Sequence, residues 1–132
     1  MPTSPGIELG KLGEQYAAAY IEQLGYRLVA ANFTLPVGRN LRGATVNAEI
    51  DLVAYDGDTL CFIEVKTRTS DWFAPPQANV DARKRRQLAR AARAYRTLFE
   101  LEDHSFRFDV VTVVLSNTDS PEVELLRNYF TV

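Results

Sequence analysis

Three residues of the chain have the types and the spacing needed for metal-dependent chemistry. Asp51 lies in one predicted strand, and Glu64 and Lys66 lie in the next. Because side chains alternate along a strand, Glu64 and Lys66 share one face. The Asp56-Gly57 pair predicts a tight turn between the strands, which would place Asp51 level with Glu64. The sequence therefore predicts two carboxylates and an ammonium group close together.

Such a pair of carboxylates favours a divalent cation. Two neighbouring carboxylates in apolar surroundings raise each other's pKa, and a cation removes the repulsion. Mg²⁺ is bound by one or two carboxylates with waters and phosphate oxygens, and Mn²⁺ prefers similar ligands. The backbone carbonyl of Val65 can add a further oxygen ligand. Lys66 would then hold the attacking water or offset charge in a phosphoryl transition state.

A solvated strand face has the same alternation of Glu and Lys, and in that interpretation Asp51 and Glu64 would point into solvent instead of converging. The neighbouring sequence favours the site, because residues 52–54 and 60–63 are apolar, as in central covered strands. Charged residues in such strands are costly unless they are paired or bound to a metal.

Two further glutamates are placed less firmly by the sequence. Glu14 lies beside the apolar stripe of the first predicted helix. Its spacing fits a fourth member of the site and a solvated helix residue equally well. Glu49 shares a strand face with Asp51, and its role stays open.

A second signal is a basic stripe in the second predicted helix. Arginines recur there at spacings of three and four residues, with a lysine beside them: Arg83, Arg86, Arg90 and Arg93, and Lys84. Arginine makes planar, multidentate contacts to phosphate, so the stripe suits a nucleic-acid backbone. A solvated helix face has the same composition. Trp72 and Phe73, in the loop before this helix, either stack on bases or anchor the loop.

The periodicities of the sequence predict the elements that position these residues. Helices are predicted at 7–24 and 81–101, and strands at 26–34, 46–55, 59–68, 106–115 and 123–130. Residues 35–45 are predicted to be a basic loop, because Pro36, Gly38, Asn40 and Gly43 interrupt the pattern. The order α-β-β-β-α-β-β predicts an α/β fold in a single domain spanning residues 1–132, with residues 1–6 disordered.

The composition excludes several classes of protein and site. Cys61 is the sole cysteine, which excludes an intrachain disulfide, and its apolar neighbours predict a buried, inert thiol. The sole histidine, His104, excludes two-histidine zinc motifs. The chain has no apolar run of 18 residues and no basic-then-apolar start, so we expect a cytoplasmic protein without a membrane span. The net charge of −2 hides seven basic residues and no acid between positions 83 and 96.

The ordered motifs of the chain resemble those of the YraN-like family, small bacterial proteins similar to Holliday-junction resolvases. The resemblance covers roughly residues 10–115. The matching residues are Gly10-Lys11-Leu12-Gly13-Glu14, Gly25-Tyr26, Asn32, Ala48-Glu49-Ile50-Asp51-Leu52, Glu64-Val65-Lys66-Thr67-Arg68, Lys84 and Arg107-Phe108-Asp109-Val110. Two departures are Ala48, where the family usually has glycine, and a longer connection at residues 35–47.

This resemblance implies a restriction-endonuclease-like fold, with a central mixed sheet flanked by helices and a PD-(D/E)XK motif. By position, Asp51 and Glu64 would be its acids, Lys66 its lysine, and Glu14 the helix glutamate of resolvase-like relatives. We expect a Mg²⁺- or Mn²⁺-dependent DNA endonuclease, acting on branched DNA in the most specific form of the hypothesis, as a homodimer. The alternatives are a non-catalytic nucleic-acid-binding module with a nuclease fold and a purely structural domain.

Overall fold

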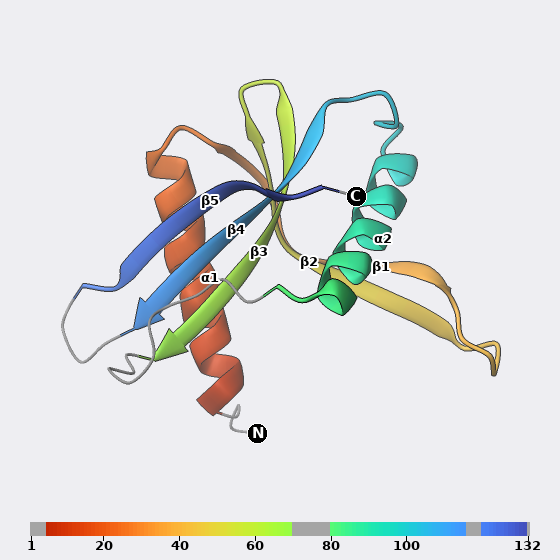
Figure 1. Cartoon of the computed structure of the whole chain (residues 1–132), viewed down its shortest axis with the longest axis horizontal. Coiled ribbons are helices and arrows are strands. Elements are labelled where there is room, and N and C mark those ends of the chain that lie inside the picture. Colours follow the sequence, from red (N-terminus) through yellow and green to blue (C-terminus); the bar gives the residue numbers. More distant parts are fainter. Residues whose placement is uncertain (1–4, 70–79, 116–119, 132) are drawn as a thin grey trace.

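The computed structural model describes residues 5–69, 80–115 and 120–131 (Figure 1). Its elements, in chain order, are α1 (Pro5–Gln23), β1 (Arg27–Arg39), β2 (Thr45–Asp56), β3 (Thr59–Thr69), α2 (Ala82–Leu98), β4 (Phe106–Leu115) and β5 (Glu122–Phe130). This order confirms the predicted α/β class and the predicted α-β-β-β-α-β-β sequence of elements. No helix in these ranges is long and apolar enough to cross a membrane.

The five strands form one mixed sheet in the order β1-β2-β3-β4-β5. β2 and β3 are the predicted antiparallel hairpin, with Asp56 opposite Thr59. β3 and β4 are parallel, so the chain must cross over between them, and α2 lies in this crossover. The other neighbouring strands are antiparallel.

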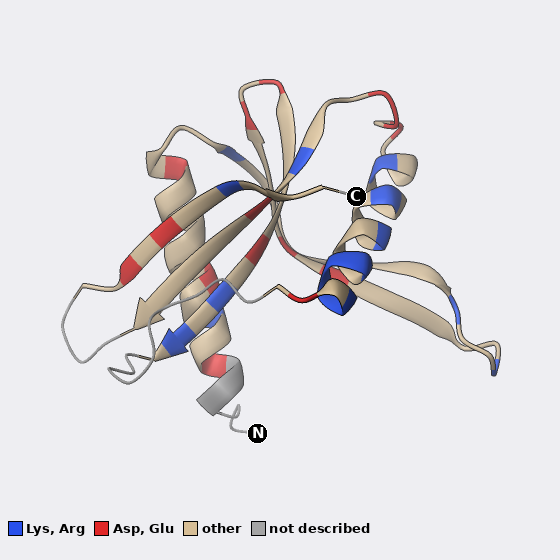
Figure 2. Ribbon diagram, in the orientation of Figure 1, with Lys and Arg blue, Asp and Glu red and all other residues tan. Residues whose placement is uncertain are grey.

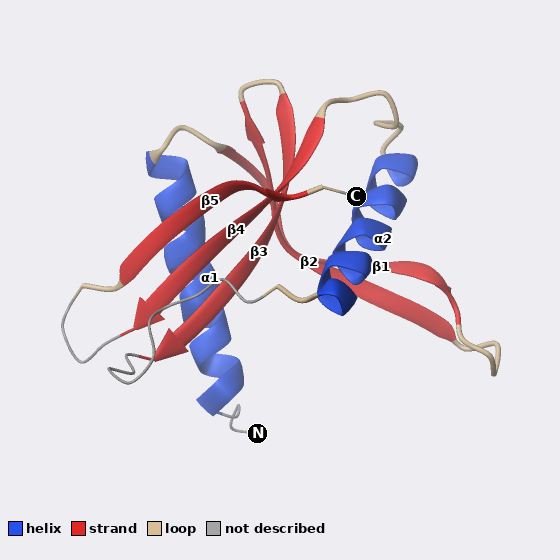
Figure 3. Cartoon of the chain, in the orientation of Figure 1, coloured by secondary structure: helices blue, strands red, loops and turns tan. Residues whose placement is uncertain are grey.

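Two buried clusters pack the helices against opposite faces of the sheet (Figure 3). Ala17 and Ile21 of α1 pack on one face with Ile63 of β3, whereas Leu88 of α2 packs on the other with Phe62. Because neighbours along β3 alternate between the clusters, this central strand is covered on both sides. The apolar run at residues 60–63 is therefore the predicted central strand, and each of its side chains is buried.

Both helices begin or end with the residues that the sequence indicated. Gly25 follows α1 with a φ of +96°, a left-handed conformation that glycine adopts without strain. Asp81 caps α2, because its carboxylate accepts a 2.9 Å hydrogen bond from the backbone N–H of Lys84. This cap fixes where the first turn of α2 begins.

β1 and β2 continue beyond the sheet as a two-stranded arm, which runs away from β3 (Figure 1). The ladder between β2 and β3 reaches Leu52 opposite Ile63, whereas the ladder between β1 and β2 continues to Arg39 opposite Thr45. The predicted loop at 35–45 is therefore wrong for residues 35–39, which belong to β1, and only residues 40–44 form a turn. Proline is tolerated at Pro36 because β1 is an edge strand, and Gly38 lies at a register shift with a φ of +150°.

Candidate metal centre

Asp51 lies where β2 leaves β3. The preceding residue, Ile50, belongs to the cluster on the α2 side, but Leu52 belongs to the cluster on the α1 side. Residues two apart in a regular strand share a face, so β2 twists sharply at Asp51. The Asp51 carboxylate accepts a 2.8 Å hydrogen bond from the backbone N–H of Val65. This bond holds Asp51 against the Glu64–Lys66 segment of β3. The position is close to the one predicted from the hairpin, in which Asp51 lies level with Glu64.

Glu14 and Glu49 meet Asp51 at this point. Each contributes a carboxylate oxygen, and the three oxygens lie within 4.8 Å of one another. Burial, followed by the charge of Asp51, raises the pKa of Glu14, while a hydrogen bond from Asn32 acts in the opposite direction. Clustered carboxylate oxygens suit a hard divalent cation, so the donor set fits Mg²⁺ or Mn²⁺.

The position of Glu14 depends on a close approach between α1 and β3. Gly13 packs against Thr67, and a Cβ at position 13 would lie 2.7 Å from the Thr67 Cβ. No real side chain fits at that distance, so glycine is required for α1 to lie this close to the sheet. In the Gly-Glu pair of the helix motif, Gly13 therefore allows the close contact with β3, and Glu14 contributes the carboxylate.

Glu64 lies at the buried side of the site. It is 3% exposed, and among the described residues its Oε2 has no hydrogen-bond partner. Burial, and then the charge of Asp51, raises the pKa of Glu64 to about 7. A buried acceptor without a partner costs about 1–3 kcal/mol, and a cation between Glu64 and Asp51 would remove that cost. The solvated interpretation of this face is therefore wrong for Glu64.

Two lysines face the other oxygen of Glu64. The Nζ atoms of Lys66 and Lys84 each lie 3.6 Å from Oε1. Each lysine side chain is 36% exposed, so both ammonium groups border the solvent side of a buried carboxylate. The sequence placed Lys84 with the basic stripe and did not assign it to this site, although Lys84 is part of the motif set.

The arginines of the basic stripe lie on the exposed side of α2, as their spacing predicted (Figure 2). One of them, Arg90, donates a 3.0 Å hydrogen bond to the carbonyl oxygen of Val37 in β1. Their role in DNA binding stays a prediction. Trp72 and Phe73 lie outside the described residues.

The Arg-Phe-Asp-Val motif lies in a separate polar network of β4. Asp109 is fully buried and accepts hydrogen bonds from Arg107 Nε at 2.9 Å and from the Tyr26 hydroxyl at 3.1 Å. Arg107 also pairs with Asp56 at the β2–β3 turn. These contacts join β2 and β4 to the segment between α1 and β1, so we assign the motif a structural role.

Cys61 is buried, as predicted, and burial raises the pKa of its thiol to about 12. The thiolate is the reactive form of cysteine, so this residue is chemically inert near neutral pH. It therefore contributes packing and no chemistry to the candidate site.

Comparison with known proteins places the chain among bacterial relatives of similar length. A model of "Uncharacterised protein family UPF0102" matches residues 13–113. A UPF0102 protein of Geobacter sulfurreducens is 41% identical over 98% of this chain and 97% of its own length. Another from Solibacter usitatus is 43% identical, covering 92% of this chain and 84% of its own. These designations name a family and no reaction.

Proposed function

The chain belongs to the uncharacterised protein family UPF0102, which agrees with its YraN-like motifs, and we propose that it is a metal-dependent endonuclease that hydrolyses phosphodiester bonds of DNA. One observation carries this proposal. Glu64 is buried with an unpartnered oxygen, beside Asp51 and next to the ammonium groups of two lysines. Buried charge of this kind is costly, and it is retained where chemistry uses it.

Asp51, Glu64 and the backbone carbonyl of Val65 would hold the cation, Mg²⁺ or Mn²⁺, with Glu14 and Glu49 adding negative charge on the α1 side. When bound, the cation polarises a phosphate oxygen and makes hydroxide available near neutral pH. The hydrogen bond from Val65 fixes Asp51, so this carboxylate is already in place before a substrate arrives.

Lys66 is the proposed catalytic lysine. Its ammonium group lies beside Glu64 and is partly exposed, so it can contact the scissile phosphate or the attacking water. Lys84 faces the same carboxylate oxygen from α2 and would keep Glu64 paired when Lys66 turns toward the substrate. Two positive charges near the developing negative charge of a phosphoryl transition state stabilise that state.

The arginine stripe of α2 is the proposed track for the DNA backbone. It lies on the helix that also supplies Lys84 to the site, so phosphates bound along α2 would lead toward the carboxylates. Arginine contacts to phosphate depend steeply on salt and not on sequence. Branched DNA and a homodimer are the most specific form of the proposal, because a four-way junction presents two symmetric strands.

A second candidate is a DNA-binding module without turnover. It is favoured by the two lysine contacts to Glu64, since two ammonium groups can neutralise this carboxylate without a metal. Binding with a steep salt dependence, and no cleavage in Mg²⁺ or Mn²⁺, would favour this candidate over the nuclease.

The proposal is tested by a cleavage assay on linear duplex, single-stranded and four-way substrates, each with Mg²⁺ or Mn²⁺. We expect cleavage that EDTA abolishes and that falls on the order of 100-fold or more in Asp51→Ala and Glu64→Ala. Glu22→Ala, an exposed glutamate at the far end of α1, is the matched control and should cleave normally. Cleavage that persists in both site variants would overturn the assignment.

A further inference from the structure

The tip of the β1–β2 arm presents a fully exposed leucine. Leu41 has a relative exposure of 107% and lies in the turn at residues 40–44, between Arg39 and Arg42. Single exposed apolar residues are common and by themselves indicate nothing. Leu41 is unusual because of where it is held and what surrounds it.

The turn that carries Leu41 is closed by its own hydrogen bonds. The Asn40 side-chain oxygen accepts from the backbone N–H groups of Arg42 at 2.9 Å and Ala44 at 3.0 Å. The Arg39 guanidinium donates to the carbonyl of Gly43 at 2.7 Å. A preorganised turn loses little conformational entropy on binding, so Leu41 is displayed at low cost to a partner.

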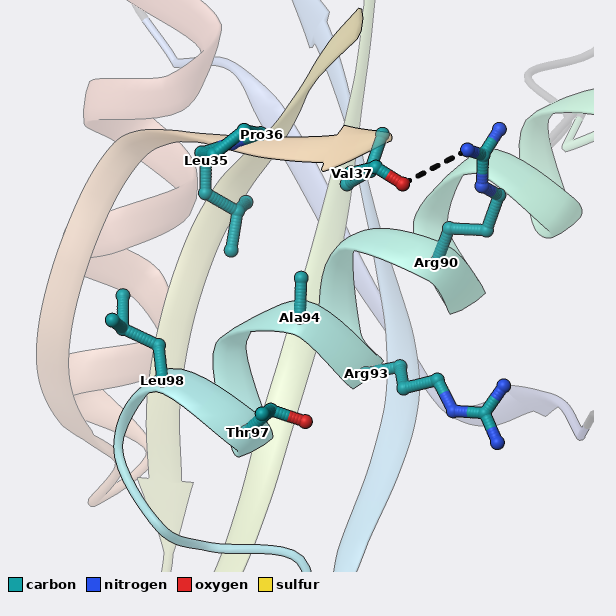
Figure 4. A pocket seen from close by; sticks show the side chains of 8 residues that line it. All are labelled: Leu35, Pro36, Val37, Arg90, Arg93, Ala94, Thr97 and Leu98. Atoms are coloured by element: carbon teal, nitrogen blue, oxygen red, sulfur yellow. Dashed lines mark hydrogen bonds between the residues drawn. The ribbon is translucent and has the colours of Figure 1, made fainter. Parts of the chain in front are cut away.

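The charge of the outer part of the arm, residues 35–48, is entirely positive. Between Arg27 and Glu49 the charged residues are Arg39 and Arg42, with no acid. The outer part of the arm is tied to the basic helix, since Arg90 bonds to Val37 of β1 (Figure 4). A cavity of about 520 Å³ lies between β1 and α2 beside this bond, with Arg93 also among its lining residues. Basic residues therefore lie on α2 and again at the arm tip (Figure 2), and Arg90 connects the helix to β1.

We propose that the arm reads DNA structure, with Leu41 inserted as a wedge between two stacked base pairs while Arg39 and Arg42 contact the flanking phosphates. Proteins that bend DNA insert leucine and similar apolar side chains at base steps, and they recover the cost through added contacts to the bent duplex. The choice of DNA as partner rests on the proposed function. The wedge gives the proposed function a substrate class, namely DNA with base steps that unstack easily, such as those at branch points.

The length of the arm predicts where the wedge acts. Asp51 lies six residue steps along β2 from Thr45, the strand residue at the base of the turn that carries Leu41, which is roughly 20 Å at about 3.3 Å per residue. This equals about six base-pair steps at about 3.4 Å each. DNA that follows the arm would therefore be unstacked about six base pairs from the cleaved bond.

The test uses 2-aminopurine, whose fluorescence rises when it is unstacked, placed at successive positions in a duplex and in a four-way junction. The full chain carrying Asp51→Asn provides binding without turnover. We expect increased fluorescence at one step, and loss of most of that increase in Leu41→Ala. Leu41→Phe should retain it, and Leu24→Ala, an exposed leucine at the end of α1, is the matched control.

Four outcomes of these experiments test the wedge and separate it from the nuclease proposal. An increase that is unchanged in Leu41→Ala overturns the wedge. A shift of Leu41→Ala to a smaller oligomer on gel filtration, with DNA binding and fluorescence unchanged, assigns the tip to a protein interface and also overturns it. Leu41-dependent unstacking without cleavage by the unmodified chain in any divalent metal supports the wedge and overturns the nuclease. Cleavage without Leu41-dependent unstacking supports the nuclease and overturns the wedge.

Discussion

The carboxylate of Asp51 accepts a hydrogen bond from the backbone N–H of Val65, the residue between Glu64 and Lys66. This contact lies beyond the point where the β2–β3 ladder ends at Leu52 and Ile63. A side chain thus replaces the next backbone contact between the two strands. Asp51 therefore has two roles, since it joins the strands and contributes charge to the acidic cluster.

Substitutions of Asp51 should separate these roles. Asp51→Asn keeps an oxygen acceptor for Val65 but removes the charge, so we expect a near-normal melting temperature and a large loss of Mn²⁺ affinity. Asp51→Ala also loses the hydrogen bond, and we expect a further destabilisation of about 1–3 kcal/mol. Thermal melts and Mn²⁺ titration calorimetry measure both quantities. Normal Mn²⁺ binding by Asp51→Asn would show that the cation site lies elsewhere.

The stability of the metal-free protein should fall as pH rises through the range in which Glu64 titrates. The folded pKa of Glu64, about 7, lies above the ordinary value of 4.5. Between these values the folded state holds a proton that the unfolded state has released, so folding weakens with rising pH by up to about 3 kcal/mol.

Melts in EDTA from pH 4.5 to 8 check this dependence. Glu64→Gln has no carboxyl to titrate, so its stability should change less over the same range. Added Mn²⁺ should raise the stability of the unmodified protein most at the upper end. Equal pH profiles for Glu64→Gln and the unmodified chain would contradict the prediction.

Removing Lys84 should shift the pH at which metal binds. The positive charge of Lys84 lowers the pKa of Glu64, so Lys84→Met should raise it further. A protonated carboxyl does not bind a cation, so the midpoint of Mn²⁺ binding should move to higher pH. Arg86→Met, an exposed residue on the same helix, is the control. A shift of equal size in both variants would point to the general charge of α2 instead.

Two glycines of α1 should respond oppositely to alanine. Gly13→Ala places a Cβ against Thr67 and should cost about 1–3 kcal/mol, because α1 must move away from β3. This movement displaces Glu14, so Mn²⁺ affinity should fall as well. Gly10→Ala meets nothing within 4 Å and should stabilise the helix by up to about 1 kcal/mol. Similar melting temperatures for the two variants would refute the close approach.

The sequence predicted well what depends on local periodicity. The helices, the central strands and the hairpin at Asp56-Gly57 follow from apolar spacing and turn residues, and the hairpin alone brings Asp51 level with Glu64. It missed the arm, because Pro36 and Gly38 interrupt a strand pattern and only the edge position of β1 makes them acceptable.

The contact between Lys84 and Glu64 also could not be predicted from the sequence. It depends on how α2 packs across β3, and spacing along the chain carries no information about that packing. The meeting of Glu49 and Glu14 depends likewise on the distance between α1 and the sheet, which a single residue, Gly13, allows.

The β2–β3 ladder ends near Asp51, whereas the β1–β2 ladder continues into the arm. The length of the arm can therefore vary without moving the carboxylates of the site. Removing one residue from each strand of the arm, with the turn at 40–44 kept, would draw the tip inward by about 3 Å. The ladder from Leu52 to Asp56 would keep its register. Under the proposed function, the length of the arm would set how far from the cleaved bond its tip contacts DNA, independently of the proposed metal ligands.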